Sequence, residues 1–225
     1  MNKSILSASD FHYHDDSRIS TALNFRSLVE TLKPDILVIG EVFDPWKSPW
    51  AKILQTETHR IMEDMCKRRW LDRKETIYIR GNHDWSAKPD YLHYTELVTR
   101  YYYEDILFMH SWEFYIDWFL IHPFAFWIAD HKPEWMCPIY NCLYGRRKSP
   151  RELKKHDTRA DWTKQIGWAH LKVQDYAIKH RVRMVVQHSH CPTPFNGIFA
   201  DDGDWFDSFS YILVGKQGKI ELKYL

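Results

Sequence analysis

Short apolar runs alternate with helical patterns along the first 80 residues, and this alternation restricts the chain to few architectures. The runs at 4–9, 36–39 and 76–79 have the length and composition of buried strands. Between them, residues 17–33 and 50–70 place apolar side chains at intervals of three and four, the spacing of amphipathic helices. Alternating strands and helices build layered folds around a largely parallel sheet. The sequence therefore predicts an α/β protein.

The second half of the chain continues the strands but contains a long stretch of different composition. With 225 residues, the chain is predicted to form a single domain, residues 1–225, with one elaboration. That elaboration is a helical, cap-like insertion over residues 123–182, which carries 12 basic and 6 acidic residues. Further strands are predicted at 106–109, 113–121, 183–186, 209–214 and 219–223.

Composition excludes several classes of protein. Hydrophobic residues make up 44% of the chain and charged residues 27%, which excludes wholesale disorder. The formal net charge of +1 argues against a globally basic nucleic-acid binder, although the insertion alone carries +6. The N-terminus has no apolar segment of the kind that directs secretion, and the longest apolar run, residues 118–129, is too short to span a bilayer. A cytoplasmic protein is therefore expected.

Side chains that bind metal ions follow the predicted strands directly. In open α/β sheets, ligands bind at the carboxyl ends of the strands, so these side chains are expected to meet. Carboxylate, amide and imidazole ligands without thiolates suit Mn²⁺, Fe or Zn²⁺. The five clusters are Asp10-Phe11-His12, Gly40 to Asp44, Gly81 to Asp84, His122, and Gln187 to His190.

Taken in order, these clusters resemble the motifs of the calcineurin-like metallophosphoesterase superfamily. The superfamily reads Asp-x-His, Gly-Asp-x-x-Asp, Gly-Asn-His-Asp/Glu, a lone His and Gly-His-x-His, and the resemblance spans residues 10–190. It implies a four-layer α/β/β/α sandwich with a helical insertion. It also implies a two-metal hydrolase of phosphoester or pyrophosphate bonds, with Mn²⁺ as the first choice and Fe or Zn²⁺ as alternatives.

The resemblance assigns a role to each matching residue. Asp10, His12 and His190 would hold one metal, and Asn82, His122 and His188 the other. Glu41 stands at the position of the bridging Asp. His83 would face the scissile phosphate and protonate the leaving oxygen, and Asp44 would orient His83.

Two positions leave alternatives open. Glu41 is one methylene longer than the usual Asp, so the alternative to an active site is a non-catalytic binding module with a degenerate site. His110 competes with His122 for the role of the lone histidine; His122 is preferred because an apolar run precedes it and the insertion follows it. Gln187 replaces the usual Gly, but it supplies no expected ligand.

A narrower resemblance concerns the substrate. Asp201 to Ser208, followed by Tyr211-Ile212-Leu213, resembles a segment of UDP-2,3-diacylglucosamine pyrophosphohydrolases and their relatives, which also carry a helical insertion. Those enzymes usually read Gly-Asn-Arg-Asp where this chain has His83, so a relative with a different phosphoester substrate is at least as well supported. The expected partner is a phosphorylated small molecule or a lipid-linked substrate, with peripheral membrane contact as an open question.

Basic side chains near the motifs are candidates for substrate binding. Arg80 precedes Gly81, and the insertion contains the run Arg146, Arg147 and Lys148. Because basic residues could equally contact a phosphodiester backbone, a nuclease acting on DNA or RNA is the alternative enzyme class.

Overall fold

Two β-sheets form the centre of the protein, for which the computed structural model describes residues 1–114, residue 135 and residues 159–225. The first sheet has the strand order β10-β9-β1-β2-β3-β4; β1 to β4 are parallel, and β9 and β10 form an antiparallel hairpin beside β1. Its strands are β1 (Ile5–Ala8), β2 (Ile36–Gly40), β3 (Glu75–Ile79), β4 (Glu96–Val98), β9 (Ser210–Val214) and β10 (Ile220–Tyr224).

The second sheet has the order β5-β6-β7-β8, in which β6, β7 and β8 are parallel and β5 runs antiparallel to β6. Its strands are β5 (Arg100–Tyr103), β6 (Ile106–Met109), β7 (Arg183–Val186) and β8 (Phe199–Asp201). Only Thr99 separates β4 from β5, so the chain passes from one sheet to the other within a single residue.

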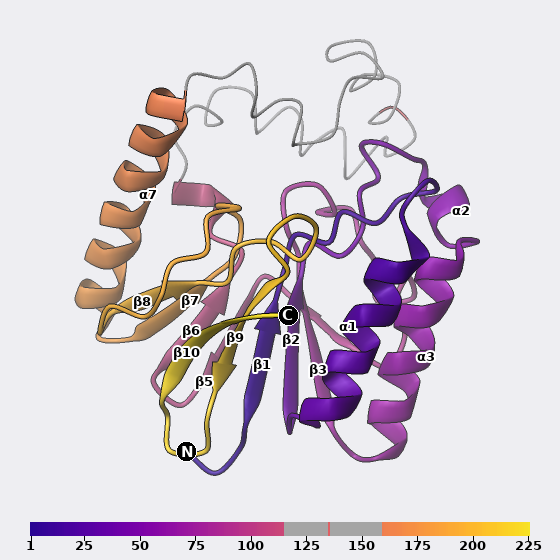
Figure 1. Ribbon diagram of the computed structural model, residues 1–225, viewed down its shortest axis with the longest axis horizontal. Helices are drawn as coiled ribbons and strands as arrows, with labels where there is room; N and C mark the ends of the chain where they lie inside the picture. Colours follow the sequence, from indigo (N-terminus) through magenta and orange to yellow (C-terminus); the bar gives the residue numbers. More distant parts are fainter. Residues whose placement is uncertain (115–134, 136–158) are drawn as a thin grey trace.

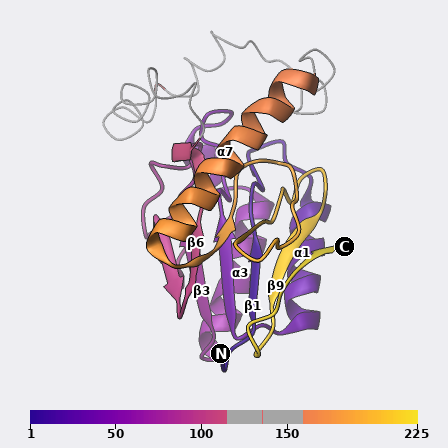
Figure 2. The ribbon, with the colours of Figure 1, turned by 90° about the vertical axis from the view of Figure 1, so that its left-hand side faces the viewer.

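Helices cover the outer face of each sheet and complete the predicted four-layer α/β/β/α sandwich. α1 (Ile19–Leu32) and α3 (Glu57–Leu71) pack on the first sheet, and α7 (Arg159–His180) packs on the second (Figures 1 and 2). The shorter helices are α2 (Trp50–Ile53) and a 3₁₀ turn, η1 (Trp112–Phe114).

Alternating side chains along each strand divide the core into three apolar layers. In β1, Leu6 packs toward α1 and α3, whereas Ile5 packs between the two sheets with Phe108 and Val185. On the far side of β7, Val186 packs with residues of α7. The central strands β2 and β6 are buried on both faces, and both are apolar throughout, as the sequence indicates.

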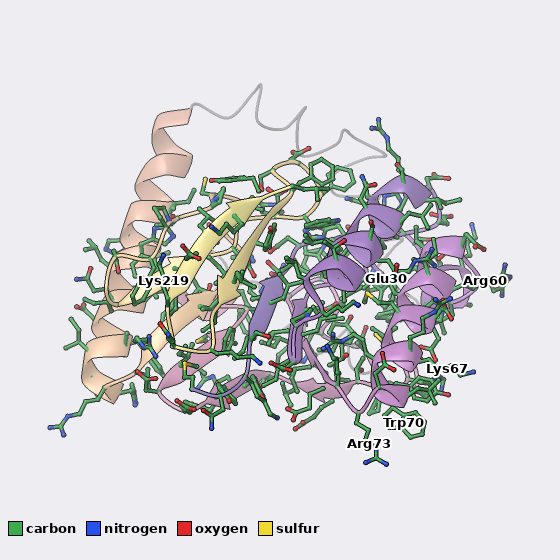
Figure 3. The ribbon with its side chains drawn as sticks, turned by 60° about the horizontal axis from the view of Figure 1, so that its bottom comes forward. Glu30, Arg60, Lys67, Trp70, Arg73 and Lys219 are labelled. Atoms are coloured by element: carbon green, nitrogen blue, oxygen red, sulfur yellow. The ribbon has the colours of Figure 1, made fainter. Side chains whose placement is uncertain are left out.

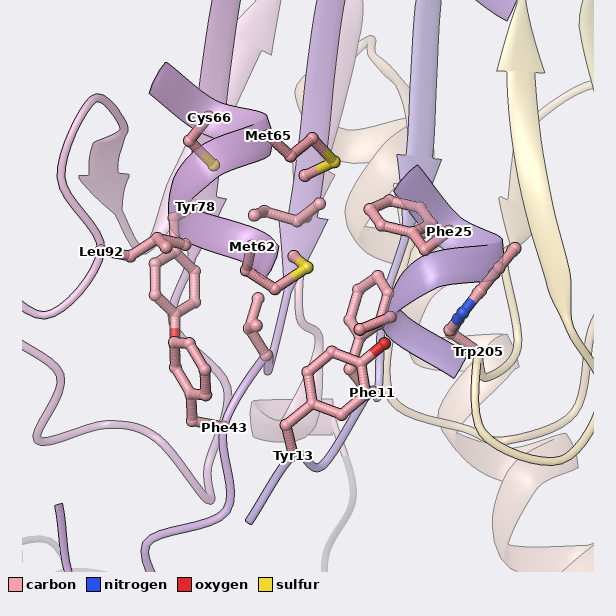
Figure 4. Packing of buried hydrophobic residues seen from close by; sticks show 14 of the residues in the cluster. Phe11, Tyr13, Phe25, Phe43, Met62, Met65, Cys66, Tyr78, Leu92 and Trp205 are labelled. Atoms are coloured by element: carbon pink, nitrogen blue, oxygen red, sulfur yellow. The ribbon is translucent and has the colours of Figure 1, made fainter. Parts of the chain in front are cut away.

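Aromatic rings anchor α1 and the C-terminal loop in the outer core (Figure 4). Phe25 of α1 packs edge-to-face against both Phe11 and Trp205, with centroid distances of 4.7 and 4.9 Å. The Trp205 indole N–H donates to the backbone oxygen of Thr21 at 3.1 Å. These contacts fix the loop that carries Asp204 next to the loop after β1, where the Trp205 backbone N–H also donates to Ser9 O at 2.9 Å.

The helix predicted over residues 50–70 is in fact two helices, α2 and α3. Thr56 interrupts it, and the Thr56 hydroxyl accepts a hydrogen bond from His59 N–H at 3.1 Å, which caps α3. An N-cap competes with helix continuation because its backbone is extended, here at φ −74° and ψ 155°. Figure 3 shows the solvent-facing side of α3, with Arg60 and Lys67 pointing outward.

The strand predicted at 113–121 is wrong at its start, since Glu113 and Phe114 belong to η1. Residues 115–121 lie outside the described part of the chain. For the predicted insertion, α7 confirms a helix at 159–180; residues 123–134 and 136–158 lie outside the described residues.

Candidate metal centre

Loops at the carboxyl ends of β1, β2, β3, β6 and β7 bring the predicted ligands together. Backbone hydrogen bonds extend the sheet beyond the strands and hold these loops: Asp10 N–H donates to Gly40 O at 3.1 Å, and Glu41 N–H donates to Ile79 O at 3.2 Å. In the second sheet, Gln187 N–H donates to Met109 O at 3.1 Å. The ligands therefore sit on loops that continue rigid strands.

Several candidate ligands have a backbone conformation that residues other than glycine rarely adopt. Each such residue costs on the order of 1–3 kcal/mol, and such residues cluster at functional sites. The φ angles are 55° for Asp10, 49° for His12, 44° for Glu41, 133° for His188 and 51° for His190.

The ligand atoms form two groups that share Asp10, and within each group they lie within 4.8 Å of one another. The first group is Asp10, His12 and His190, with the Asp10 Oδ1 atom 3.7 Å from His12 Nε2 and 3.5 Å from His190 Nε2. The second group contains Asp10 and Glu41 with His110 and His188. The two groups could each hold one cation.

Glu41 belongs to the second group and also faces His12 of the first. Its Oε2 atom is 3.4 Å from His12 Nε2 and 3.3 Å from His110 Nε2, and its Oε1 atom accepts a hydrogen bond from His83 N–H at 2.6 Å. A Cβ atom at Gly81 would lie 2.5 Å from Glu41 Oε1 and 2.6 Å from Glu41 Cβ, so only glycine fits there. The position of Glu41 thus depends on the glycine in the third cluster.

Several buried polar atoms at this site have hydrogen-bonding capacity that no described residue uses. Asp10 Oδ1, Asn82 Oδ1 and both ring nitrogens of His110 are buried and make no hydrogen bond with any described residue. Burial alone would raise the pKa of Glu41, but the nearby imidazoles, His110 first, bring it down to about 2. An ionised buried carboxylate among such atoms fits a divalent cation, because oxygen and imidazole ligands are those that Mn²⁺, Fe and Zn²⁺ accept.

His83 is oriented by groups on the loop after β2. Its Nδ1 atom lies 3.0 Å from Asp44 Oδ1, and its ring stacks on Trp46 with centroids 4.3 Å apart and planes 20° apart. Although burial lowers the pKa of His83, the carboxylates of Asp44 and Glu41 outweigh that effect and raise it. His83 remains 18% exposed, so one edge of the ring is open toward solvent.

His110, the alternative to His122 for the role of the lone histidine, lies beside Asp10 and Glu41. His110 directly follows β6, is 1% exposed, and has its Nε2 atom 3.6 Å from Asp10 Oδ1. His122 lies outside the described residues, as do Arg146, Arg147 and Lys148. The sequence feature that points to His110 is the wholly apolar run at 106–109, which forms β6. This strand pairs in parallel with β7, the strand that precedes His188.

Asp204 was not among the predicted site residues, yet its Oδ2 atom lies 3.5 Å from His190 Nδ1. Its other oxygen accepts backbone N–H groups of Asp207 and Ser208, at 2.5 and 2.9 Å, so the carboxylate is held in place. A carboxylate behind a metal-binding histidine fixes its tautomer and ring orientation. The conspicuous motif around Trp205 could have pointed to Asp204.

Gln187 fills the space between the two sheets behind the ligands. Its Nε2 atom donates to Ser7 Oγ at 3.0 Å and to Asp202 Oδ2 at 3.3 Å. A Cβ atom on Gly40 would lie 2.1 Å from Gln187 Oε1, so Gly40 makes room for this side chain. Gln187, which stands where the family usually has glycine, is therefore accommodated in a buried network of hydrogen bonds.

Carboxylates and imidazoles that meet in overlapping groups at the carboxyl ends of two packed sheets define a candidate metal-binding site. The family model of calcineurin-like phosphoesterases matches residues 3–217, and the chain belongs to this family. Family membership makes it a metal-dependent phosphoesterase in the general sense.

Comparison with solved structures finds a similar protein, TT1561 of Thermus thermophilus. The match covers 100% of this chain and 99% of the other, at 10% sequence identity and a TM-score of 0.47. Comparison with curated proteins finds no match. No helix in the described part of the chain is long and apolar enough to cross a membrane.

Proposed function

We propose that the protein hydrolyses a phosphoester or pyrophosphate bond with two divalent cations, Mn²⁺ being the first choice. The observation that carries this proposal is the placement of Glu41, whose Oε2 atom faces His12 of one group and His110 of the other. A carboxylate in that position can bridge two cations, even though it is one methylene longer than the family's usual aspartate.

The first cation would be held by Asp10, His12 and His190, and the second by Glu41, His110 and His188, with Asn82 on the adjoining loop. Bound cations would activate a water molecule for attack at neutral pH and offset charge on the phosphoryl oxygens. We assign this ligand to His110 because His110 lies at the site, whereas His122 lies outside the described residues.

His83 would donate a proton to the leaving oxygen. Asp44 accepts from His83 Nδ1, which leaves the Nε2 atom to face the substrate, and Trp46 restricts rotation of the ring. A positioned acid of this kind contributes about 10²–10⁴-fold to the rate.

The proposal is tested with purified protein, bis(p-nitrophenyl) phosphate and defined Mn²⁺. Hydrolysis should disappear with chelator and return with Mn²⁺. His83→Ala should keep its Mn²⁺ and lose about 10²–10⁴-fold in kcat, whereas His93→Ala, a change at an exposed histidine, should leave kcat unchanged. A protein that binds Mn²⁺ but hydrolyses no phosphoester would instead be a binding module.

A nuclease is distinguished by substrate and salt. Cleavage of DNA or RNA with affinity that falls steeply as salt rises would identify a phosphodiester polymer as the substrate. Weak binding of nucleic acid that does not depend on salt would instead favour a small phosphorylated molecule as the substrate.

A further inference from the structure

A small pocket adjoins the proposed metal centre and shares one of its ligands. The pocket has a volume of about 240 Å³ and is lined by His110 together with Arg80, Trp85, Thr99, Arg100 and Trp112. Sites that enclose a whole small molecule usually measure about 300–1,000 Å³. This pocket therefore has room for one group of a substrate whose reacting phosphate lies at the metal centre.

Arg80 gives the pocket its clearest chemical preference. Its backbone N–H donates to Val98 O at 2.9 Å, which fixes the residue directly after β3. Its Nε atom is buried and makes no hydrogen bond with a described residue. A guanidinium cannot lose its proton, so a buried donor of this kind is best satisfied by an anion.

The rest of the lining agrees with an anionic occupant. Arg100 adds a second positive charge and is steadied by α7, since its Nη1 atom donates to the Tyr176 hydroxyl at 3.3 Å. Trp85 and Trp112 meet edge-to-face at 5.9 Å and add apolar surface beside the two guanidinium groups. Among the residues that the structure describes, no carboxylate lines the pocket.

We propose that this pocket binds a second phosphate group of the substrate, beside the phosphate that undergoes hydrolysis. Arginine binds phosphate with two parallel hydrogen bonds, and sharing His110 with the metal centre keeps the two phosphates close. The substrate class is then a pyrophosphate or a compound with two neighbouring phosphates. The inference rests on the proposed function for the position of the first phosphate.

Equilibrium binding tests this inference without any turnover. Inorganic phosphate and methylenediphosphonate, a pyrophosphate analogue whose P–C–P bridge cannot be hydrolysed, are titrated into the Mn²⁺-loaded full chain by calorimetry, with free Mn²⁺ held constant because the diphosphonate also binds the ion. The wild type should prefer the diphosphonate about tenfold or more, the value of one charge-assisted hydrogen bond. Arg80→Gln should lose that preference, while Arg80→Lys should retain part of it.

Arg73→Gln is the matched control, because Arg73 precedes β3 whereas Arg80 follows it, and this change should leave the preference intact. Figure 3 shows Arg73 near Trp70 of α3. A wild type without preference, or an Arg80→Gln protein with the wild-type ratio, would overturn the inference. If Arg80→Gln does not fold, Arg100→Gln serves in its place, with a reduced preference expected. A protein that hydrolyses nothing but shows the Arg80-dependent preference would refute the proposed function and support the pocket.

Discussion

Glu41 uses both oxygens of its carboxylate at the candidate metal centre. One oxygen faces His12 and His110, and the other accepts the backbone N–H of His83. The Glu41 side chain therefore contacts both the proposed metal ligands and the backbone of the proposed acid, His83. An aspartate at the same backbone position is too short to make both contacts.

The first prediction at the residue scale concerns this length. Glu41→Asp should lower kcat for bis(p-nitrophenyl) phosphate by about 100-fold, since a misplacement of about 1 Å can have that effect. Glu41→Gln, which keeps the length and removes the charge, should bind Mn²⁺ more weakly than Glu41→Asp. An Asp variant as active as the wild type would show that the site tolerates either length.

The second prediction concerns Asp204. Asp204→Asn should weaken Mn²⁺ binding by about 10–100-fold, because the carboxylate orients His190 without touching the metal. Dissociation constants from Mn²⁺ titration measure this effect. Asp72→Asn, at the C-terminus of α3 and away from the site, is the control and should bind as the wild type does. If Asp204→Asn binds Mn²⁺ as tightly as Asp72→Asn does, Asp204 does not support the metal centre.

At the scale of elements, the strands that end in ligands were predicted well, whereas of the edge strands only β10 was predicted. The runs at 36–39, 76–79 and 106–109 are buried on both faces, so composition alone reveals β2, β3 and β6. β4 and β8 were missed because each is only three residues long, and β5 was missed because its side chains, like those of β4, are partly exposed or exposed.

The site follows the same pattern. Asp10, His12, Glu41, Asn82, His188 and His190 were predicted from motifs directly after strands, and the structure gathers the five acidic and histidine members into the two groups. The sequence offers both His110 and His122, since both follow apolar runs. The pairing of β6 with β7 places His110 at the site, whereas His122 lies outside the described residues. The motif around Trp205 marks Asp204, but only the fold shows that its carboxylate lies against His190 of the preceding motif.

The prediction at this scale concerns the break between α2 and α3. Thr56→Ala should lower the free energy of unfolding by about 1 kcal/mol, because the first turn of α3 loses the hydroxyl that accepts from His59 N–H. Urea denaturation measures the change. Thr31→Ala, where the hydroxyl bonds within α1 to Ser27 O, should change the free energy by less than about 0.5 kcal/mol. Equal losses in the two variants would contradict the capping role.

At the scale of the whole molecule, the packing of one sheet on the other creates the metal centre. Each sheet supplies only part of each proposed ligand set: Asp10, His12 and Glu41 come from the first sheet, and His110, His188 and His190 from the second. The apolar layer between the sheets, built on residues such as Ile5, Phe108 and Val185, therefore sets the distance between the two halves of the site.

The measurement that tests the central claim most directly is the metal content of the purified chain after equilibration with Mn²⁺, by mass spectrometry of the element. The account predicts about two ions per chain in the wild type and a loss of about one ion in each of His190→Ala and His110→Ala, with no loss in His93→Ala. A wild type that holds no Mn²⁺, or two substituted proteins that both keep two ions, would contradict a two-metal centre shared between the sheets.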